Sequence, residues 1–444
     1  MVLPRGRRGL QMSRPSLVLI PQHFGALLFD RRSSRYMPFD APAAAVLTRL
    51  TEHTADDVIG DAEAGDRDAV IGLIQHLSTK GYLRMDGRLA AARIDRAPPP
   101  DHLLGPLAVH LEVIGACNLT CTHCFAGELP RNQSPLSVKE MDALFAQLAG
   151  LGSFRLGLTG GEPLMRKDLL DILDAATGHG LHPCITTNAL LIDERWAREL
   201  GKRELVWLNV SLEGAQAGTN DAVRGAGVFD RVMEKLALLG QHARFTLAFT
   251  LTRDNVAEVE ACVELARRVG AHTAVFRPLY PVGTATRHPE LMPTFDGYVD
   301  ALARLERVEA DSDLFALDPF SPSAREELRG VVTEGPGCGA ANTVASVSVQ
   351  GNVNPCSFLG RAFESGNIRT RPFEDIWRDG QSFQRLRAKQ TGDRFTGGCR
   401  ARAQFYNGSA FAEDPWQAQS LGAATESHPL PVLGAERGQG GACR

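Results

Sequence analysis

Three cysteines stand close together in the segment Cys117-Asn118-Leu119-Thr120-Cys121-Thr122-His123-Cys124. Soft thiolate ligands select iron–sulfur clusters or zinc over harder cations. A structural zinc site normally needs four ligands, and no fourth cysteine or suitably spaced histidine follows nearby, since His123 lies inside the loop itself. Three thiolates can instead hold three irons of a cubic cluster and leave the fourth iron open. The spacing therefore favours a cluster with an open iron over a closed zinc site.

This segment resembles the signature of the radical S-adenosylmethionine (SAM) enzymes, and a second mark of that family follows it. Thr159-Gly160-Gly161-Glu162-Pro163 resembles the family's GGEP motif, whose glycines let the backbone approach the methionine end of the cofactor. The acidic side chain and carbonyls of that motif receive the cofactor's ammonium. The resemblance implies that Cys117, Cys121 and Cys124 hold a [4Fe-4S] cluster whose open iron binds SAM. Reductive cleavage of SAM would give methionine and a 5′-deoxyadenosyl radical that abstracts hydrogen from the substrate.

Other positions resemble the family's cofactor contacts. Asn188 follows an expected strand, and Ser211 with Glu213-Gly214 ends the next, where the family contacts the ribose. Arg224 resembles the arginine that pairs with the cofactor carboxylate, a role suited to a guanidinium fork, although helix capping or solvation is an alternative for Ser211 and Arg224. His123 stands where relatives often carry an aromatic beside the adenine. The implied SAM-binding set is His123, Gly160, Gly161, Glu162, Pro163, Asn188, Ser211 and Arg224. No catalytic acid or base is assigned.

A second group of cysteines lies near the C-terminus. Cys338, Gly351-Asn352-Val353-Asn354-Pro355-Cys356 and Gly397-Gly398-Cys399-Arg400-Ala401 resemble the SPASM domain. That module belongs to radical enzymes that modify peptides and to some that modify haem precursors, and it commonly holds two auxiliary clusters. Cys338, Cys356 and Cys399 match ligands of the nearer cluster. Cys184 and Cys262, in contrast, fall inside a strand and a helix and are interpreted as small buried apolar residues.

The SPASM pattern is incomplete. The family's Cys-x-x-Cys is absent, and Thr396 and Gln417 stand at two more cysteine positions, so we expect the distal cluster to be missing. The nearer cluster lacks a fourth ligand, for which Cys443, another protein group or the substrate are candidates. A three-cysteine zinc site or no metal remains an alternative. Ser357 stands where sulfatase-maturing relatives carry an acidic proton acceptor, so that chemistry is not expected.

The elements that must position these residues are strands alternating with helices. A chain of 444 residues is long enough for two or three domains. Alternation implies a parallel sheet, here a partial (β/α)6 barrel of the α/β class, with functional groups at the carboxyl ends of its strands. The expected strands are 107–114, 154–159, 182–187, 206–212, 245–251 and 273–276.

The N-terminal region reads as a separate small domain. Residues 15–30 predict a β-hairpin, 41–51 and 67–81 predict helices, and 82–84 predict a short wing strand. This winged-helix-like outline resembles the PqqD-type peptide-recognition domain, which captures a leader peptide by strand addition. The predicted organisation is 15–86 PqqD-like, 87–105 linker, 106–300 radical SAM barrel, 330–416 a small α+β SPASM-like domain and 418–444 a disordered tail.

The net charge and the lengths of the apolar runs exclude some classes of binding partner. A formal net charge of -4 lacks the basicity that phosphate backbones attract, so nucleic acid is not an expected partner. No apolar run reaches the roughly 18 residues that span a membrane, and the stretch Leu17 to Ile20 is too short for a signal core. We therefore expect a cytoplasmic protein without a membrane partner.

Together these features predict a radical SAM maturase of a ribosomally synthesised precursor peptide. Its implied cofactors are a [4Fe-4S] cluster, SAM and one auxiliary iron–sulfur cluster. Its implied partners are the precursor peptide, whose leader the N-terminal domain binds, and an electron donor such as ferredoxin or flavodoxin. Two alternatives remain open from the sequence: radical modification of a tetrapyrrole side chain, and a non-catalytic metal-binding adaptor.

Overall fold

The computed structural model describes residues 15–127, 134–309, 315–317, 338–388 and 392–424. The chain divides into two compact units, residues 1–101 and 102–444. The division falls at the end of the segment that carries Pro98-Pro99-Pro100. No helix in the described residues is both long enough and apolar enough to cross a membrane.

The first unit packs helices against one face of a sheet. Its strands are β1 (Leu17–Gln22), β2 (Gly25–Asp30), β3 (Arg35–Asp40) and β4 (Ala91–Arg93), and its helices are α1 (Ala41–Leu50), α2 (Ala55–Gly60) and α3 (Arg67–Thr79). The strand order is β3-β2-β1-β4, with β4 parallel to β1. The core is built from side chains such as Leu17, Leu28, Leu47 and Leu77, all fully buried. β3 therefore forms one edge of this sheet.

The expected hairpin and the two expected helices of this unit are confirmed, but helix α2 was not predicted, and three further segments differ from expectation. β3 was not predicted because Pro38, which is unfavourable in strands, interrupts its apolar pattern. Residues 82–84 form no strand and contribute only an isolated bridge between Leu83 and Leu89. Segment 87–105 is not a plain linker, because Ala91–Arg93 pairs with β1.

The second unit is built on one large sheet. The strands are β5 (Ala108–Ile114), β6 (Arg155–Gly160), β7 (His182–Thr187), β8 (Trp207–Leu212), β9 (Thr246–Leu251), β10 (Thr273–Pro278), β11 (Phe315–Leu317), β12 (Val344–Val347) and β13 (Val353–Asn354). In the described residues their order is β11-β10-β9-β8-β7-β6-β5-β12-β13, and only β13 is antiparallel to its neighbour. All six expected barrel strands are present and lie side by side in sequence order.

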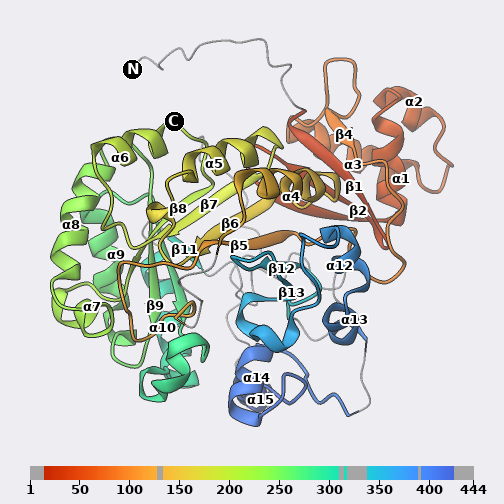
Figure 1. The fold of residues 1–444 in the computed structure, drawn as a ribbon. Coiled ribbons are helices and arrows are strands. Elements are labelled where there is room, and N and C mark those ends of the chain that lie inside the picture. Colours follow the sequence, from red (N-terminus) through yellow and green to blue (C-terminus); the bar gives the residue numbers. More distant parts are fainter. Residues whose placement is uncertain (1–14, 128–133, 310–314, 318–337, 389–391, 425–444) are drawn as a thin grey trace. The chain divides into compact units, whose positions relative to one another are not determined.

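Helices follow most of these strands and cover the outside of the sheet (Figure 1). They are α4 (Val138–Gly150), α5 (Leu169–Gly178), α6 (Glu194–Gly201), α7 (Ala217–Arg224), α8 (Val228–Leu239), α9 (Val259–Arg268) and α10 (Phe295–Glu309). α4 begins with the expected capping box, in which Ser137 and Glu140 bond each other's backbone amides. On β5, side chains alternate between the two faces, so that Leu111 lies on one face and His110 and Glu112 on the other.

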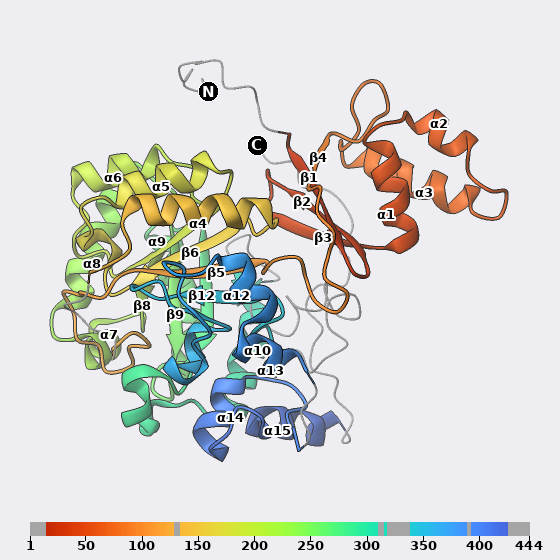
Figure 2. The ribbon, with the colours of Figure 1, turned by 45° about the vertical axis from the view of Figure 1, so that its right-hand side comes forward.

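The C-terminal segment continues the barrel sheet. β12 pairs with β5 in parallel and β13 follows antiparallel, so residues 344–354 extend the sheet past its first strand. Short 3-10 helices η5 (Ser357–Leu359) and η6 (Arg361–Phe363) come next, then α12 (Phe373–Asp379), α13 (Gln381–Arg387), α14 (Arg400–Asn407) and α15 (Pro415–Ala424). Figure 2 shows α14 and α15 side by side, away from the strands.

The predicted disordered tail is wrong in its first residues. α15 continues to Ala424, because Trp416 in its first turn stacks on Tyr298 with ring centroids 5.2 Å apart and anchors the helix. Residues 425–444, including the candidate ligand Cys443, lie outside the described residues.

Candidate functional site

The loop of three cysteines follows β5 at the carboxyl edge of the barrel sheet, as expected. Neighbouring elements fix its backbone. The amide of Thr122 donates to the carbonyl of Val223 over 3.0 Å. Thr284 donates twice to the carbonyl of Cys124, from its amide over 2.9 Å and from its hydroxyl over 3.1 Å. No pattern in the sequence indicates this role for Thr284, which lies after β10 and meets the loop only in the tertiary structure.

Gly283 packs directly against the cysteine loop. Its φ is +58°, and a Cβ atom there would lie 2.3 Å from the carbonyl oxygen of Cys124. Any other residue would force this loop away from the end of β10. The turn at Pro281-Val282-Gly283 therefore supports the loop that carries the cysteines.

The glycines of the Gly160-Gly161-Glu162 run bring the end of β6 onto the backbone that precedes Cys117. The amide of Gly161 donates to the carbonyl of Ile114 over 2.6 Å, and the amide of Glu162 donates to the carbonyl of Ala116 over 2.9 Å. A Cβ atom on Gly161 would lie 2.0 Å from the oxygen of Ala116. The glycine at this position is thus required by the packing of the two loops.

Glu162 joins the ends of β6 and β7. Its buried carboxylate accepts hydrogen bonds from the hydroxyl of Thr187 over 2.6 Å and from the amides of Leu164 and Asn188 over 3.0 and 2.8 Å. Burial raises the pKa of Glu162 even though these three donors lower it. Pro163 then starts a 3-10 helix, η1 (Pro163–Met165). The carboxylate therefore holds the loop that presents Asn188.

Asn188 reaches the cysteine loop. Its side-chain amide donates to Oδ1 of Asn118 over 2.8 Å and lies 3.9 Å from the sulfur of Cys117. Two of the predicted site residues, Asn188 and Glu162, are thereby connected to the first cysteine. Burial raises the pKa of the second cysteine of the loop, Cys121, to about 11, although the nearby Arg224 lowers it.

A buried charged cluster stands on the other side of the loop. Glu213 binds both Nε and Nη2 of Arg224, and its Oε1 lies 3.0 Å from Nε2 of His123. Burial alone would raise the pKa of Glu213, but Arg224 and His123 outweigh it and hold the pKa at about 2. Burial would likewise lower the pKa of Arg224, and Glu213 raises it above its usual value. The sequence did not indicate that the carboxylate of Glu213 binds the guanidinium of Arg224.

Ser211 lies near the carboxyl end of β8, two residues before Glu213. It is half-buried and stands opposite Ala248 of β9 in the sheet register. No side-chain hydrogen bond in the described part of the chain joins Ser211 to Glu213, Arg224 or His123. Its assignment to the cofactor site stays a prediction.

The SPASM-like cysteines come from three segments of the second unit. Cys338 lies close enough to Cys399 to raise its pKa, which burial, the larger cause, lifts to about 11. The amide of Ala341, beside Cys338, donates to the carbonyl of Pro355 over 3.2 Å and so holds this loop next to Cys356. The amide of Cys399 donates to Asp414 over 2.6 Å.

The donor set fits an iron–sulfur cluster. Cys117, Cys121 and Cys124 are free thiols and partly exposed. No three Cys, His, Asp or Glu side chains among the described residues converge closely enough to hold a single metal ion. A cubic cluster presents a different iron to each thiolate and does not require such convergence. Nδ1 of the buried His123 has no hydrogen-bond partner in the described residues, which leaves a polar group available to a ligand beside the loop.

Comparisons with known proteins agree with this geometry. The model of the Radical SAM superfamily matches residues 111–266, and that of SPASM, an iron–sulfur cluster-binding domain, matches residues 338–401. The mycofactocin maturase MftC of Mycobacterium ulcerans is 32% identical over 357 residues, which cover 75% of this chain and 94% of that protein. The AdoMet-dependent heme synthase of Nitratidesulfovibrio vulgaris is 28% identical over 68% of this chain and 90% of that protein.

Among solved structures, Streptococcus suis SuiB bound to the precursor peptide SuiA has a similar fold. The match has a TM-score of 0.69 at 18% identity and covers 90% of this chain and 98% of SuiB. Residues 102–444 alone cannot supply that coverage, so the fold similarity extends into the first unit. The chain belongs to the radical SAM superfamily, as an enzyme that uses SAM and a [4Fe-4S] cluster and carries a SPASM-type iron–sulfur cluster-binding domain.

Proposed function

We propose that this enzyme modifies a ribosomally synthesised precursor peptide. The relative MftC is named a maturase, and the similar SuiB fold was solved with a precursor peptide. The observation that carries the choice of a peptide is the first unit, a small sheet with an edge strand attached to the radical SAM barrel. An additional sheet edge suits an extended peptide, which can pair with it through main-chain hydrogen bonds.

The cysteine loop and its neighbours hold the cofactors. In this proposal Cys117, Cys121 and Cys124 bind three irons, while Asn118 and Thr284 keep the loop in place. When bound, the cluster and SAM supply a 5′-deoxyadenosyl radical that removes a hydrogen atom from the peptide. SAM is oriented by groups of the cysteine loop, of the ends of β6, β7 and β8 and of the end of α7, namely His123, Gly160, Gly161, Glu162, Pro163, Asn188, Ser211 and Arg224.

Arg224 and His123 act as a unit with Glu213. Because Glu213 neutralises the guanidinium and fixes its plane, Arg224 can offer only its remaining N–H groups to the cofactor carboxylate. The contact between Glu213 and Nε2 of His123 leaves Nδ1 free of any partner in the described residues. The imidazole is thereby fixed beside the loop where an adenine would stack.

The leader peptide is assigned to the first unit, which we interpret as PqqD-like. β4 covers the β1 edge of the sheet, whereas β3 pairs only with β2 in the described residues. We therefore place the leader along β3 (Arg35–Asp40), with the half-buried side chains Met37 and Phe39 available beside it. Main-chain bonds would supply affinity and these side chains specificity.

The auxiliary cluster is assigned to Cys338, Cys356 and Cys399, which come from neighbouring segments of the second unit. An electron donor such as ferredoxin or flavodoxin is the remaining partner. Free thiols and iron–sulfur clusters persist in reducing compartments, which supports a cytoplasmic location.

A second candidate is the modification of a tetrapyrrole side chain. It is favoured by the heme synthase relative, whose length the chain covers to 90%. The two candidates differ in their need for the first unit, since a tetrapyrrole offers no backbone for strand addition.

The deciding experiment deletes residues 1–101, which removes the complete first unit including β4. We expect the anaerobically reconstituted truncated enzyme to retain slow cleavage of SAM, since every proposed cofactor ligand lies beyond residue 107. Tight binding of the precursor peptide, and its modification measured by mass spectrometry, should be lost. The full-length enzyme is the control. Equal peptide turnover by both proteins would contradict leader capture by the first unit. Absence of peptide turnover by the full-length enzyme would move the tetrapyrrole candidate ahead.

A further inference from the structure

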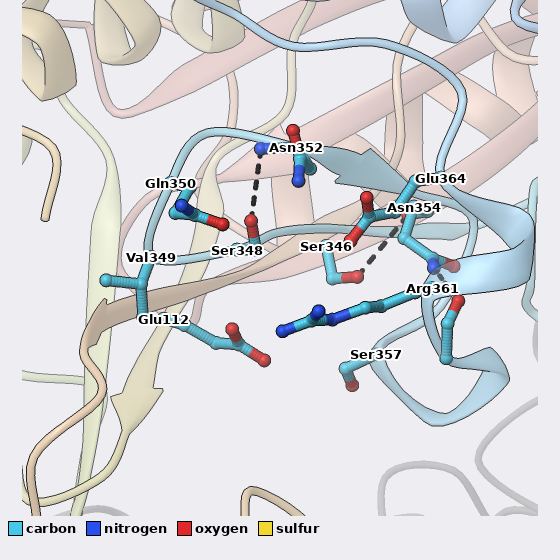
Figure 3. Close-up of a pocket in the computed structure, with 11 residues that line it drawn as sticks. Glu112, Ser346, Ser348, Val349, Gln350, Asn352, Asn354, Ser357, Arg361 and Glu364 are labelled. Atoms are coloured by element: carbon cyan, nitrogen blue, oxygen red, sulfur yellow. Dashed lines mark hydrogen bonds between the residues drawn. The ribbon is translucent and has the colours of Figure 1, made fainter. Parts of the chain in front are cut away.

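A polar pocket lies where the first barrel strand meets the SPASM-type segment. It has a volume of about 90 Å³ and is lined by Glu112 of β5 together with residues 346–364 of the C-terminal segment (Figure 3). Glu112 is buried, whereas Arg361 on the opposite wall is exposed. The pocket, called here the Glu112 pocket, thus connects a buried carboxylate with the protein surface.

Glu112 is the unusual group of this pocket. Only 8% of the residue is exposed, and its Oε2 atom has no hydrogen-bond partner in the described residues. The backbone amide of Val349 bonds the carboxylate. A buried carboxylate oxygen without a partner costs folding free energy, so its retention calls for a ligand that satisfies it.

The surroundings of Glu112 set its protonation. Burial raises its pKa to about 7; the Val349 amide and Arg361 oppose this rise, and Glu364 adds to it. Figure 3 shows the Glu112 carboxylate and the Arg361 guanidinium pointing toward one another. Two carboxylates and one guanidinium face this pocket, so its charge favours a ligand that donates hydrogen bonds over an anionic ligand.

The pocket is lined by segments that lead to both sets of cysteines. Glu112 stands opposite Thr159 in the register of β5 and β6, at the edge where the cysteine loop begins. Ser357, which follows Cys356, lines the pocket from the other side. The next residue, Phe358, contacts Phe125 of the cysteine loop, with ring centroids 6.1 Å apart. A substrate that approaches the SAM site therefore lies next to this pocket.

We propose that the Glu112 pocket is a substrate subsite that holds one small hydroxyl- or amine-bearing side chain of the peptide, with Glu112 accepting its hydrogen bond. This inference rests on the proposed peptide-modifying function. The volume of about 90 Å³ leaves room for a few waters or one small side chain, which excludes a larger ring system from the pocket itself. Glu112 then supplies the carboxylate of the substrate site, because Ser357, which also lines the pocket, is neutral.

The first arm of the test needs no peptide. The carboxyl stretching band of Glu112 is obtained in the full-length protein as the infrared difference between wild type and Glu112→Gln, and it is titrated with pH. Ethanolamine is the probe, because it carries a hydroxyl and an ammonium group, and acetate is the matched control. We expect ethanolamine to lower the midpoint by about one pH unit and acetate to leave it unchanged or raise it.

The second arm measures peptide turnover. With the precursor peptide as substrate, Glu112→Gln should raise KM about tenfold with a smaller change in kcat, because a hydrogen bond to a charged group is lost. Glu112→Asp should recover part of the loss. Ser348→Leu, which narrows the pocket without altering Glu112, should also raise KM.

The outcomes separate this inference from the proposed function. Absence of SAM cleavage by the wild-type enzyme would overturn the proposed function. A wild-type enzyme that turns over peptide, together with an unchanged KM in Glu112→Gln, would overturn the subsite alone. An infrared midpoint that ethanolamine does not move would also overturn it, because the pocket would then not bind a donor.

Discussion

Glu213 binds the guanidinium of Arg224 with both of its carboxylate oxygens, and the same carboxylate contacts His123 of the cysteine loop. All three side chains are buried. One negative charge thus connects the end of β8, the end of α7 and the loop that carries the three cysteines. Removing it would leave a desolvated guanidinium without a counter-ion next to the cofactor site.

We expect Glu213→Gln to lower the free energy of unfolding at pH 7 by about 3–5 kcal/mol, the usual cost of breaking a buried ion pair. The folded-state pKa of Glu213 is lowered from 4.5 to about 2, so its stabilising effect is complete above pH 4.5 and is lost as pH falls toward 2. Urea unfolding at several pH values measures both effects.

The matched control is Glu234→Gln on the exposed side of α8. It should leave both the stability and its pH dependence nearly unchanged. If the Glu213 variant and wild type lose stability equally on acidification below pH 4.5, the carboxylate is not held in its charged form by Arg224 and His123.

Replacing Cys117, Cys121 and Cys124 together by alanine should abolish formation of 5′-deoxyadenosine, because three thiolates are needed to hold a cluster with one open iron. The product is measured after anaerobic reconstitution with dithionite and SAM. Cys262→Ala on α9 is the control and should retain activity, since Cys262 is buried in the helix layer. Undiminished cleavage by the triple variant would refute the assignment of these cysteines.

The number of clusters tests the assignment of the C-terminal cysteines. Because Thr396 and Gln417 replace cysteines of the distal cluster and the Cys-x-x-Cys is absent, the reconstituted protein should contain at most two clusters. The Cys117/Cys121/Cys124 triple variant should contain at most one. Iron and acid-labile sulfide are measured per chain, and two clusters in the triple variant would contradict this prediction.

Arg402 organises the C-terminal helices through its guanidinium. It lies 3.7 Å from the ring centroid of Trp416 and 3.5 Å from Asp414, and it is buried. Lysine cannot stack on an indole in this way, so Arg402→Lys should lower the free energy of unfolding by about 1–2 kcal/mol. Thermal unfolding measures the change, with the exposed Arg231→Lys as control. Equal destabilisation by both substitutions would show that the stacking contributes nothing.

Much of the fold follows from patterns that are local in the sequence. The six barrel strands and helix α4 were predictable, because apolar alternation and the Ser137/Glu140 capping box act over a few residues. The cysteine loop was predictable for the same reason, since its ligands lie within eight residues. Strand β3 was not, because its pairing with β2 overrides the unfavourable Pro38.

The sequence by itself determined the chemistry of the cysteine loop and the order of the barrel strands. Only the tertiary structure decided that β12 pairs with β5, that Glu213 holds Arg224 and His123, and that Glu112 faces the C-terminal segment. These contacts join residues that are far apart in the sequence, as Glu112 and Arg361 are, with about 250 positions between them. Their geometry depends on which strands pair in the sheet and in which register, and local spacing in the sequence does not specify that pairing.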